Sequence, residues 1–378
     1  MHVALVYNQK KEDHLQPATD VHGELAIASL EALQGSAHPA TFSSSHAPLS
    51  GSTPANDLYA EWDSVETIHA VRDALAELHQ VSMIEANEDA FERLRTERPQ
   101  IVFNIAEGLY GISREAQMPA IFEMLRIPYS GSDPLTLAIC LDKSRAKEIL
   151  AHYGVQTPGF MVVNTPEEMT ACNPSFPAMV KPLHEGSSKG IFNSSVVNDA
   201  AGLRRELERV LFHYKQPALV EEFLPGREFT VAMLGNGPHL NVLPIVEIKF
   251  DSLPDGVNKI YSYEAKWIWD TAAAPLEIFQ CPADLTDSLR VEIETLCRKA
   301  YTVLRCRDWS RIDVRLDANG RPHIIELNPL PGILPKPEDN SCFPKAARAA
   351  GLSYNRLMQS VIAFAAERHG VGARTGRN

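Results

Sequence analysis

The chain has 378 residues, of which 44% are hydrophobic and 22% charged, and its formal net charge is −12. This length allows two or three compact lobes, and the negative charge argues against a general binder of nucleic acid or anionic membranes, which needs a basic surface. No run of 18 consecutive apolar residues occurs, and the first eleven residues lack a signal-peptide pattern, so we expect a cytoplasmic protein.

Residues 1–133 are expected to form an N-terminal α/β domain. Short apolar runs predict strands, and stretches with helical spacing predict the helices between them: strands at 3–7, 81–86 and 101–105, helices at 64–78 and in the segment ending at Arg98. This alternating order predicts a small open parallel sheet. Helical spacing also occurs at 21–33, and the Ser-, Pro- and Gly-rich stretch 35–57 predicts a long surface loop.

The rest of the chain predicts two further lobes and a short tail. A basic helix at 142–153 and strands at 159–163 and 177–183 place a central lobe at 134–215. The remainder is strand-rich up to residue 334 and ends in amphipathic helices over 343–368. We therefore expect a C-terminal lobe at 216–370 and a tail at 371–378.

The strongest chemical signal is a hairpin predicted over 311–329, with an Asp-Ala-Asn-Gly turn whose Asn-Gly pair supplies positive φ. By the period of two along each strand, polar side chains share a face: Arg311, Asp313 and Arg315 on the first strand, Glu326 and Asn328 on the second. Carboxylate and amide oxygens on adjacent strands suit Mg²⁺ beside nucleotide phosphates. The alternative is a surface hairpin with weak cross-strand salt bridges, and the apolar neighbours of Glu326 argue against it.

A lysine followed by a loop of small residues gives the second signal. Lys181 ends an apolar strand, so its ammonium group enters a protected site. The loop at 185–190, Glu-Gly-Ser-Ser-Lys-Gly, has backbone amides that can close on phosphate oxygens. It does not match the Walker A motif, and an isolated loop of this kind is more often a plain turn. The preceding lysine favours the phosphate interpretation.

The segment 218–234 gives the third signal. A strand delivers acidic residues, apolar residues follow, and a further glutamate comes after a Pro-Gly turn: Glu221, Glu222, Phe223, Leu224 and Glu228. An adenosine needs hydrogen bonds to its edge, apolar cover on its faces and a carboxylate for the ribose hydroxyls, all of which this segment can supply. An acidic, exposed strand end is the alternative for any one of these residues.

In this order, these segments resemble the ATP-grasp fold of the D-alanine–D-alanine ligase family, from about residue 100 to the C-terminus. Five motifs carry the resemblance. RIPYSGSDPLTLAICLDKSRAKEIL leads to a first phosphate-contacting lysine (Lys143), VKPLHEGSSKG is similar to a second lysine and mobile loop, LVEEFLPGREFTV to the adenine linker, YSYEAKW to a loop with a further lysine (Lys266), and WSRIDVRLDANGRPHIIELNPLPG to the catalytic hairpin. The resemblance implies an ATP-grasp fold of the α/β class, preceded by the parallel-sheet domain.

The resemblance also implies a role for each matched residue. ATP would be held at its phosphates by Lys143, Lys181, Lys266, Glu185, Gly186 and Ser188, and at its adenosine by Glu221, Glu222, Phe223, Leu224 and Glu228. Two Mg²⁺ ions, with Mn²⁺ as an alternative, would be bound by Asp313, Glu326 and Asn328. Catalysis would fall to Arg311, which would stabilise the oxyanion of the tetrahedral intermediate, with Ser187 and Lys266.

The departures from the family fall at its amino-acid subsites. Its histidine-glycine motif appears here as Glu107-Gly108, and Trp267 stands in place of a tyrosine after the loop lysine. The glutamate expected after the first strand is missing, with Glu61 or Glu66 as candidates to stand in. These changes predict altered substrates.

The segment after the hairpin departs as well. Gly332 is retained as a substrate-site residue, but the serine expected beyond it is replaced near Lys336 and Pro337. A lysine there offers a point charge on a flexible stem in place of a hydroxyl. Because the nucleotide motifs are intact, the sequence predicts the family's chemistry on other substrates.

We therefore predict an ATP-dependent ligase that activates a carboxylate as an acyl phosphate and joins it to an amine, with amino acids as substrates. The alternatives are a true D-alanine–D-alanine ligase of cell-wall synthesis, a non-catalytic ATP-binding module and a phosphotransferase that stops at the acyl phosphate. The arginine at position 311 argues against a mere binding module. We expect small-molecule partners, no nucleic acid or membrane, and a homodimer as one possible assembly. The identity and stereochemistry of the substrates stay open.

Overall fold

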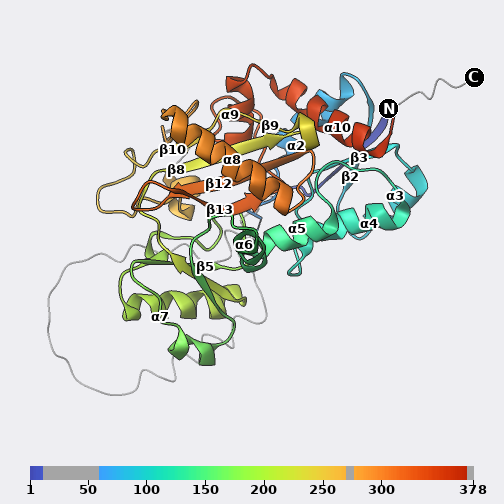
Figure 1. Ribbon diagram of the computed structural model, residues 1–378. Coiled ribbons are helices and arrows are strands. Elements are labelled where there is room, and N and C mark those ends of the chain that lie inside the picture. Colours follow the sequence, from blue (N-terminus) through green and yellow to red (C-terminus); the bar gives the residue numbers. More distant parts are fainter. Residues whose placement is uncertain (12–58, 270–275, 373–378) are drawn as a thin grey trace, which may run out of the picture. The chain divides into compact units, whose positions relative to one another are not determined.

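Three sheets organise the residues that the computed structural model describes, which are 1–11, 59–269 and 276–372 (Figure 1). The predicted helix at 21–33 and loop at 35–57 lie outside these residues. Apart from Lys11, the described chain belongs to one compact unit.

The N-terminal sheet is parallel, as predicted, with the strand order β2-β1-β3. Its elements are β1 (His2–Tyr7), α2 (Val65–Ala76), β2 (Gln80–Glu85), α3 (Ala90–Glu97), β3 (Ile101–Asn104) and α4 (Gln117–Leu125). Ser64 caps α2 by accepting a hydrogen bond from the Thr67 amide at 3.2 Å, which satisfies one of the helix's free amides. Alternate side chains of β1 pack into two cores, Val3 and Leu5 with α2, and Ala4 and Val6 with α3 and α4.

The second sheet is antiparallel, with the order β4-β7-β5-β6. Its elements are β4 (Phe160–Val163), β5 (Ala178–Pro182), β6 (Val196–Val197), α7 (Ala200–Arg209) and β7 (Ala218–Glu222), with a 3₁₀ helix at Pro166–Ala171. Leu203 and Leu207 of α7 pack on its apolar face (Figure 1). Since β7 pairs with both β4 and β5, this sheet extends past the boundary predicted at residue 215.

The third sheet has six strands, ordered β11-β10-β8-β12-β13, with β9 paired to β8. Its elements are β8 (Glu228–Leu234), β9 (Asn241–Val242), β10 (Val246–Ile248), β11 (Phe279–Gln280), β12 (Trp309–Leu316) and β13 (Pro322–Asn328), with α8 (Asp287–Val303), α9 (Cys342–Ala349) and α10 (Tyr354–His369). Helix α8 lies over the strands in Figure 1 and packs on one face, and α9 packs on the other. The sequence analysis did not predict α8, although Ile293, Leu296, Cys297 and Ala300 show its apolar spacing.

Helices α5 (Pro134–Leu141) and α6 (Lys143–His152) link the sheets. Cys140, Ala146 and Leu150 share a core with α8 and with β8, β12 and β13 of the third sheet, although the sequence analysis placed them in the central lobe. The three-lobe division therefore stays a proposal. Helices α5 and α6 pack beside the third sheet, and strand β7 belongs to the second sheet.

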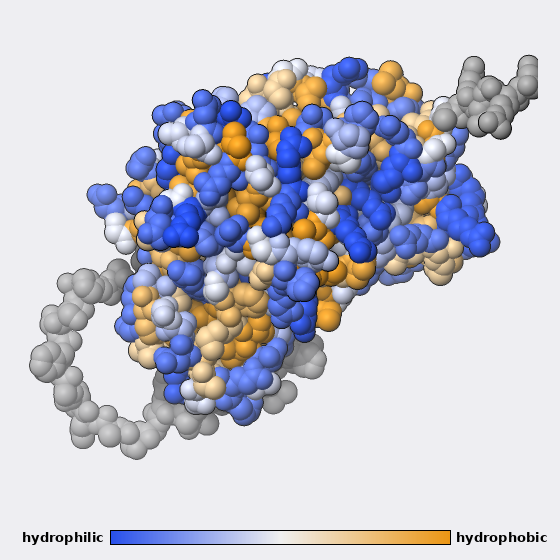
Figure 2. Space-filling view, viewed as in Figure 1, coloured by the Kyte–Doolittle hydropathy of each residue, from blue (hydrophilic) through white to orange (hydrophobic). Residues whose placement is uncertain are grey.

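The surface carries the mixed character that the composition predicts. Polar residues cover most of the face shown in Figure 2, and apolar residues form patches between them. Within the described ranges, no helix combines the length and apolar character needed to cross a membrane.

Candidate active site

Two neighbouring cavities contain most of the predicted site residues. The first cavity has about 980 Å³ of empty space and is lined by residues of β5, β7, β8, β12 and β13, and the second has about 840 Å³ and is lined by the N-terminal domain and by the segment after β13. Six residues line both: Glu185, Gly186, Ser187, Lys266, Arg311 and Glu326. Groups from the two cavities can therefore meet at these shared residues.

The hairpin of β12 and β13 presents its polar face to the first cavity because of a β-bulge. Asp313 lies opposite Glu326 and Val314 opposite Ile324, so Ile325 is an extra residue in β13. Without the bulge, the alternation along β13 would place Ile325 opposite Asp313 and turn Glu326 into the core. The turn needs positive φ only at Gly320, where φ is 78°.

Buried charges compensate one another on this face. Arg311 Nη2 lies 2.9 Å from Asp313 Oδ2 and 3.8 Å from Glu326 Oε1, and Lys143 Nζ lies 3.7 Å from Glu326 Oε2. Burial raises the pKa of Glu326, but Lys143, Lys181 and Arg311 outweigh it and hold that pKa at about 2. Glu326 is therefore ionised at neutral pH. For Asp313, burial raises the pKa against the opposing effect of Arg311.

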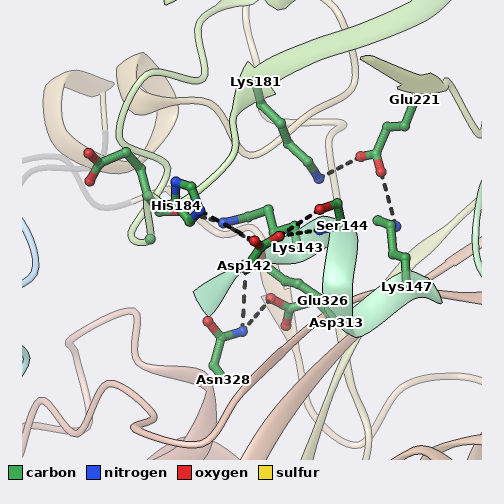
Figure 3. A network of polar contacts seen from close by, with 12 residues as sticks. Asp142, Lys143, Ser144, Lys147, Lys181, His184, Glu221, Asp313, Glu326 and Asn328 are labelled. Atoms are coloured by element: carbon green, nitrogen blue, oxygen red, sulfur yellow. Dashed lines mark hydrogen bonds and ion pairs between the residues drawn. The ribbon is translucent and has the colours of Figure 1, made fainter. Parts of the chain in front are cut away.

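The hairpin fits the donor chemistry of a magnesium site. The amide of Asn328 lies 3.3 Å from Asp313 Oδ2 and 3.4 Å from Glu326 Oε1, so the three groups converge (Figure 3). Among the described residues, no group of three or more His, Cys, Asp and Glu side chains is placed to hold a metal ion by itself. Mg²⁺ commonly binds one or two carboxylates and completes its shell with phosphate oxygens and water, which suits this partial set.

A glutamate bridged by two lysines lies across the first cavity from the hairpin (Figure 3). Glu221 Oε1 is 2.5 Å from Lys181 Nζ and Glu221 Oε2 is 3.0 Å from Lys147 Nζ, with all three side chains buried. Burial lowers the pKa of Lys147 to about 8, with Glu221 opposing, whereas Glu221 and Glu326 together keep that of Lys181 raised despite burial. Lys181 and Glu326 line the same cavity.

The sequence analysis missed Lys147, although a signal was present. Lys147 follows Lys143 by four residues on α6, so both lie on one face of the helix. Asp142 caps this helix by accepting hydrogen bonds from the amides of Ser144 and Arg145 at 3.0 and 3.1 Å. The cap holds Lys143 in the first turn, where its ammonium group donates to the carbonyl of Glu185.

The glycine- and serine-rich loop has a constrained backbone. Ser187 and Ser188 adopt positive φ of 51° and 59°, an uncommon conformation for residues with a side chain, and the Ser188 hydroxyl donates to the Tyr261 carbonyl at 2.8 Å. The Gly186 amide donates to Glu61 Oε1 at 2.7 Å, and a Cβ atom at position 186 would lie 2.6 Å from that oxygen. A side chain at position 186 would therefore displace the Glu61 carboxylate from the loop.

The predicted adenosine-binding residues line the first cavity together. Glu221, Glu222, Phe223, Leu224 and Glu228 are joined there by the apolar side chains of Met179, Ile191, Ile248 and Ile260. Leu224 is buried, and Glu228 is 2.5 Å from Arg315 Nη1. An apolar slot with carboxylates at its rim suits a flat aromatic base and a sugar. In this structure, however, the Glu221 carboxylate is occupied by its two lysines.

Carboxylates dominate the second cavity. Four that line it come from the N-terminal domain: Glu61, Asp63, Glu107 and Glu115. Both carboxylate oxygens of Glu61 accept a hydrogen bond from Arg114 Nη2 at 2.7 Å, and the sequence analysis named Glu61 as one of two candidates to replace the missing glutamate. Burial raises the pKa of Glu115 to about 8 and that of Asp63 to about 7. The sequence showed no spacing pattern that would have grouped Asp63, Arg114 and Glu115 at this place.

Four other predicted site residues differ in where they lie. Gly332 lines the second cavity, and Lys266 lines both cavities, where burial and Arg311 lower the pKa of Lys266 to about 8. The side chain of Trp267 lies outside the described residues. Lys336 lines neither cavity: its Nζ is 2.8 Å from Glu66 Oε1, with both side chains exposed. We therefore remove Lys336 from the candidate substrate residues.

A serine hydroxyl lies beside Gly332 in space, at a position that the sequence analysis did not consider. The Ser341 hydroxyl donates to the Gly332 carbonyl at 3.1 Å and accepts from the Leu334 amide at 3.2 Å. A segment of eight residues separates Gly332 from Ser341 along the chain, so local spacing does not reveal this contact. Ser341 itself is not among the residues that line the two cavities.

Comparison with known sequences agrees with this geometry. Residues 150–363 match the family described as D-ala D-ala ligase C-terminus. The chain is 35% identical over 269 residues to the Sinorhizobium fredii protein y4sG, described only as uncharacterized, covering 71% of this chain and 75% of that protein. It is 34% identical over 267 residues to the D-alanine–D-alanine ligase of Bordetella petrii, covering 70% of this chain and 76% of that enzyme.

Comparison with solved structures supports the fold. The D-alanine–D-alanine ligase of Bacillus anthracis in complex with ATP aligns over 98% of this chain and 99% of its own, with a TM-score of 0.62 and 20% identity. A second structure of the same enzyme gives a TM-score of 0.64. The predicted α/β ATP-grasp fold is therefore confirmed.

Proposed function

The chain belongs to the D-alanine–D-alanine ligase family and is an ATP-dependent carboxylate–amine ligase, and from this premise we propose that it joins two small amino-acid-type substrates that are not both D-alanine. One observation carries the proposal: all of the residues proposed for the nucleotide except Lys143 line the first cavity, whereas the second contains Glu107 and Glu115, which form no ion pair with the residues that the structure describes. The chemistry is therefore kept while the place for the substrates differs.

In the proposed reaction, ATP occupies the first cavity and the two other substrates occupy the second. A carboxylate oxygen of the donor attacks the γ-phosphorus and the bond to ADP breaks, which forms an acyl phosphate. The amine of the acceptor then attacks the acyl carbon, loses a proton, and inorganic phosphate leaves with the oxygen that the donor contributed. Both steps need reacting groups at the border of the cavities, where Lys266, Arg311 and Glu326 lie.

The charged side chains would act by neutralising and orienting the reacting groups. Lys143, Lys181 and Lys266 are proposed to hold the phosphates, and Arg311 to donate to the oxyanion of the tetrahedral intermediate. Asp313, Glu326 and Asn328 would hold Mg²⁺, which neutralises phosphate charge when it is bound. The number of ions, and whether Mn²⁺ substitutes, belong to this proposal.

The loop at 185–190 is proposed to close over the reactants. Its serines already adopt positive φ, and Gly186, Ser187 and Glu185 border both cavities. Ser187 and Ser188 would turn toward the phosphates and help to exclude water from the acyl phosphate, which water would otherwise hydrolyse.

A true D-alanine–D-alanine ligase is the second candidate function. It is favoured by Ser341, which returns a hydroxyl to the carbonyl of Gly332 at the edge of the second cavity. The opposing observation is Glu107, which places a carboxylate in that cavity where the family motif has a histidine.

Phosphate release from Mg·ATP, screened over pairs of amino acids and small carboxylates, tests the proposed function. We expect at least one pair to give stoichiometric amide, ADP and phosphate, with ¹⁸O from a labelled donor carboxylate recovered in the phosphate. Release of ADP without any amine acceptor would favour the phosphotransferase alternative. Amide formation without transfer of ¹⁸O to phosphate would contradict the acyl phosphate.

A further inference from the structure

Glu107 and Glu115 lie side by side in the wall of the second cavity. Glu115 is nine-tenths buried, with 9% of its surface exposed, and Glu107 is half-buried. Within the ranges that the structure describes, neither carboxylate takes part in a hydrogen bond or an ion pair. A buried carboxylate normally has a charged or hydrogen-bonding partner, which Glu115 lacks among these residues and which the cavity can admit.

The nearby cations are already engaged with other carboxylates. Arg114 Nη2 lies 2.7 Å from both oxygens of Glu61, and its Nη1 donates to the His184 carbonyl at 2.8 Å. Lys189 Nζ lies 3.2 Å from Glu185 Oε2. Arg114 and Lys189 are thus already paired with other groups in the part of the chain that the structure describes.

Lys143 also makes its contacts with groups other than Glu107 and Glu115. Its Nζ is 3.7 Å from Glu326 Oε2 and donates to the Glu185 carbonyl. Asp63, a further acidic side chain of this cavity, supplies no positive charge. Burial, followed by Glu115 and Glu61, raises the pKa of Glu107 well above its ordinary value, against the opposing effect of Arg114. A cation bound beside Glu107 and Glu115 would favour their charged forms, which burial disfavours in the substrate-free protein.

The backbone holds Glu107 in place, so it cannot relax toward solvent at little cost. The Gly108 amide donates to Asn8 Oδ1 at 2.8 Å, and the indole of Trp62 donates to the Gly108 carbonyl at 2.9 Å. Gly108 has a φ of 72°, and a Cβ atom there would lie 2.7 Å from the Arg114 carbonyl oxygen. Glycine and two hydrogen bonds thus fix the position from which Glu107 extends.

The missing partner has the chemistry of an organic cation. A metal ion is disfavoured, because Glu107 and Glu115 offer only two carboxylates and, unlike at the hairpin, no nucleotide phosphate is proposed beside them to complete its shell. An ammonium or guanidinium group, in contrast, needs only two carboxylates and can bring its own apolar stem. The cavity opens at residues shared with the first cavity, so such a group can arrive on a substrate.

We propose that Glu107 and Glu115 form a subsite for a side-chain cation, and that one of the two substrates is a basic amino acid such as lysine or ornithine. The inference rests on the proposed function, because it assigns the second cavity to the substrates of the ligase. The basic group pairs with the two glutamates while the reacting end of the same molecule lies near Arg311 and Lys266.

A comparison of lysine with norleucine distinguishes recognition of a side-chain cation from simple apolar packing. Norleucine has the same carbon chain and lacks only the ε-ammonium group. The full-length wild-type protein with Mg·ATP is assayed for amide formation with each enantiomer of both compounds, each paired with D-alanine. We expect lysine of one configuration to exceed norleucine in kcat/KM by about 10-fold or more, as for a charge-assisted hydrogen bond in a buried site. Equal values, or a preference for norleucine, would overturn the inference.

Variants of the two glutamates test whether they cause the preference for lysine over norleucine. Glu107→Gln and Glu115→Gln should each lower the lysine-to-norleucine ratio about 10-fold, whereas Glu92→Gln, which removes an exposed carboxylate of α3, should leave it unchanged. A ratio that stays at the wild-type value in both cavity variants would contradict the subsite.

Binding measured without turnover distinguishes this inference from the proposed function. With Mg·ADP present, lysine should raise the melting temperature of the wild-type protein more than norleucine does, and Glu115→Gln should remove the difference. If no substrate pair is turned over but this difference is found, the ligase proposal fails and the cation subsite stands. If norleucine or alanine pairs are joined and lysine gives neither turnover nor a melting shift, the subsite fails and the ligase proposal stands.

Discussion

The two cavities share six residues but balance their charges differently. In the first, each buried carboxylate has a cation at short range, as with Glu221 between Lys147 and Lys181 and Asp313 beside Arg311. In the second, Glu61 is paired with Arg114, but Glu107 and Glu115 form no ion pair with any residue that the structure describes. A cavity whose charges are already paired is organised before its ligand binds, whereas an unpaired cavity depends on the ligand to supply the missing charge.

This contrast suggests that the two sites serve different purposes. Phosphoryl transfer relies on fixed positive charge, which a chain can keep while its substrates change. Substrate choice depends on a few side chains that leave a wrong ligand with an unpaired charge. On the proposed function, the first cavity keeps the chemistry of the family, and the second determines the substrates of this chain.

The largest effect is expected from Glu326→Ala, which removes a carboxylate from the hairpin in the first cavity. Phosphate release from Mg·ATP should fall about 10³-fold, because a proposed metal ligand and the partner of Lys143 are both lost. The melting temperature should change little, since Glu326 lies on the cavity face rather than in the core. Activity within a few-fold of the wild type would remove the metal role, and Glu92→Ala serves as the exposed control.

A smaller loss is expected from Arg311→Lys, which keeps the charge and removes the planar fork. Lysine cannot contact both Asp313 and an oxyanion in the same way, so kcat should fall on the order of 10²-fold. The affinity for ATP, measured by titration with a nonhydrolysable analogue, should stay within a few-fold. A weakened affinity with unchanged kcat would place Arg311 in binding rather than in catalysis.

Hydrogen exchange can show whether the loop at 185–190 closes. Addition of Mg²⁺ and a nonhydrolysable ATP analogue should slow amide exchange in residues 184–191 by roughly 10-fold, while strand β1 serves as an internal reference. Protection that is the same with and without the analogue would contradict the proposed closure.

The smallest effect concerns pH and stability in the substrate-free protein. Glu115 has a folded pKa of about 8, above its ordinary value of 4.5, so the folded state binds more protons than the unfolded state between these values. Its contribution to the free energy of unfolding therefore falls as the pH rises from about 5 to 8. Asp63 acts with the same sign, up to its pKa of about 7.

Glu115→Gln should reduce this pH dependence. Relative to the wild type, the variant should gain about 2 °C or more in melting temperature at pH 8, and less at pH 5. Scanning calorimetry at both values measures the difference. A melting temperature that falls by the same amount at both pH values would indicate a structural role for Glu115 instead.

Much of the first cavity could be predicted from sequence because its residues lie in short, ordered motifs. Period-two alternation placed Asp313 on the cavity face, but alternation alone would not have placed Glu326 opposite it. The bulge at Ile325 places Glu326 opposite Asp313, and an isoleucine at that position does not predict a bulge. Lys147 was predictable from its helical spacing, because it follows Lys143 by one turn, but the resemblance assigned no role to it.

The second cavity was harder to predict because its residues come from distant segments. Glu61, Glu107 and Glu115 meet only after the parallel sheet brings its loops together, and Arg114 then ties Glu61 to the loop after β5. The prediction for Lys336 failed because the eight-residue segment between Gly332 and Ser341 turns it toward Glu66. Contacts of this kind depend on tertiary structure rather than on local spacing.

D-alanine as the sole amino acid gives the most direct test that the second cavity has changed its substrates while the first cavity keeps its chemistry. The wild-type protein with Mg·ATP is assayed for dipeptide by mass spectrometry and for phosphate release in the same reaction. We expect little or no D-alanyl-D-alanine, together with turnover of at least one other amino-acid pair. Dipeptide formed from D-alanine alone at about 1 s⁻¹ or faster, a rate typical of enzymes, would contradict the account.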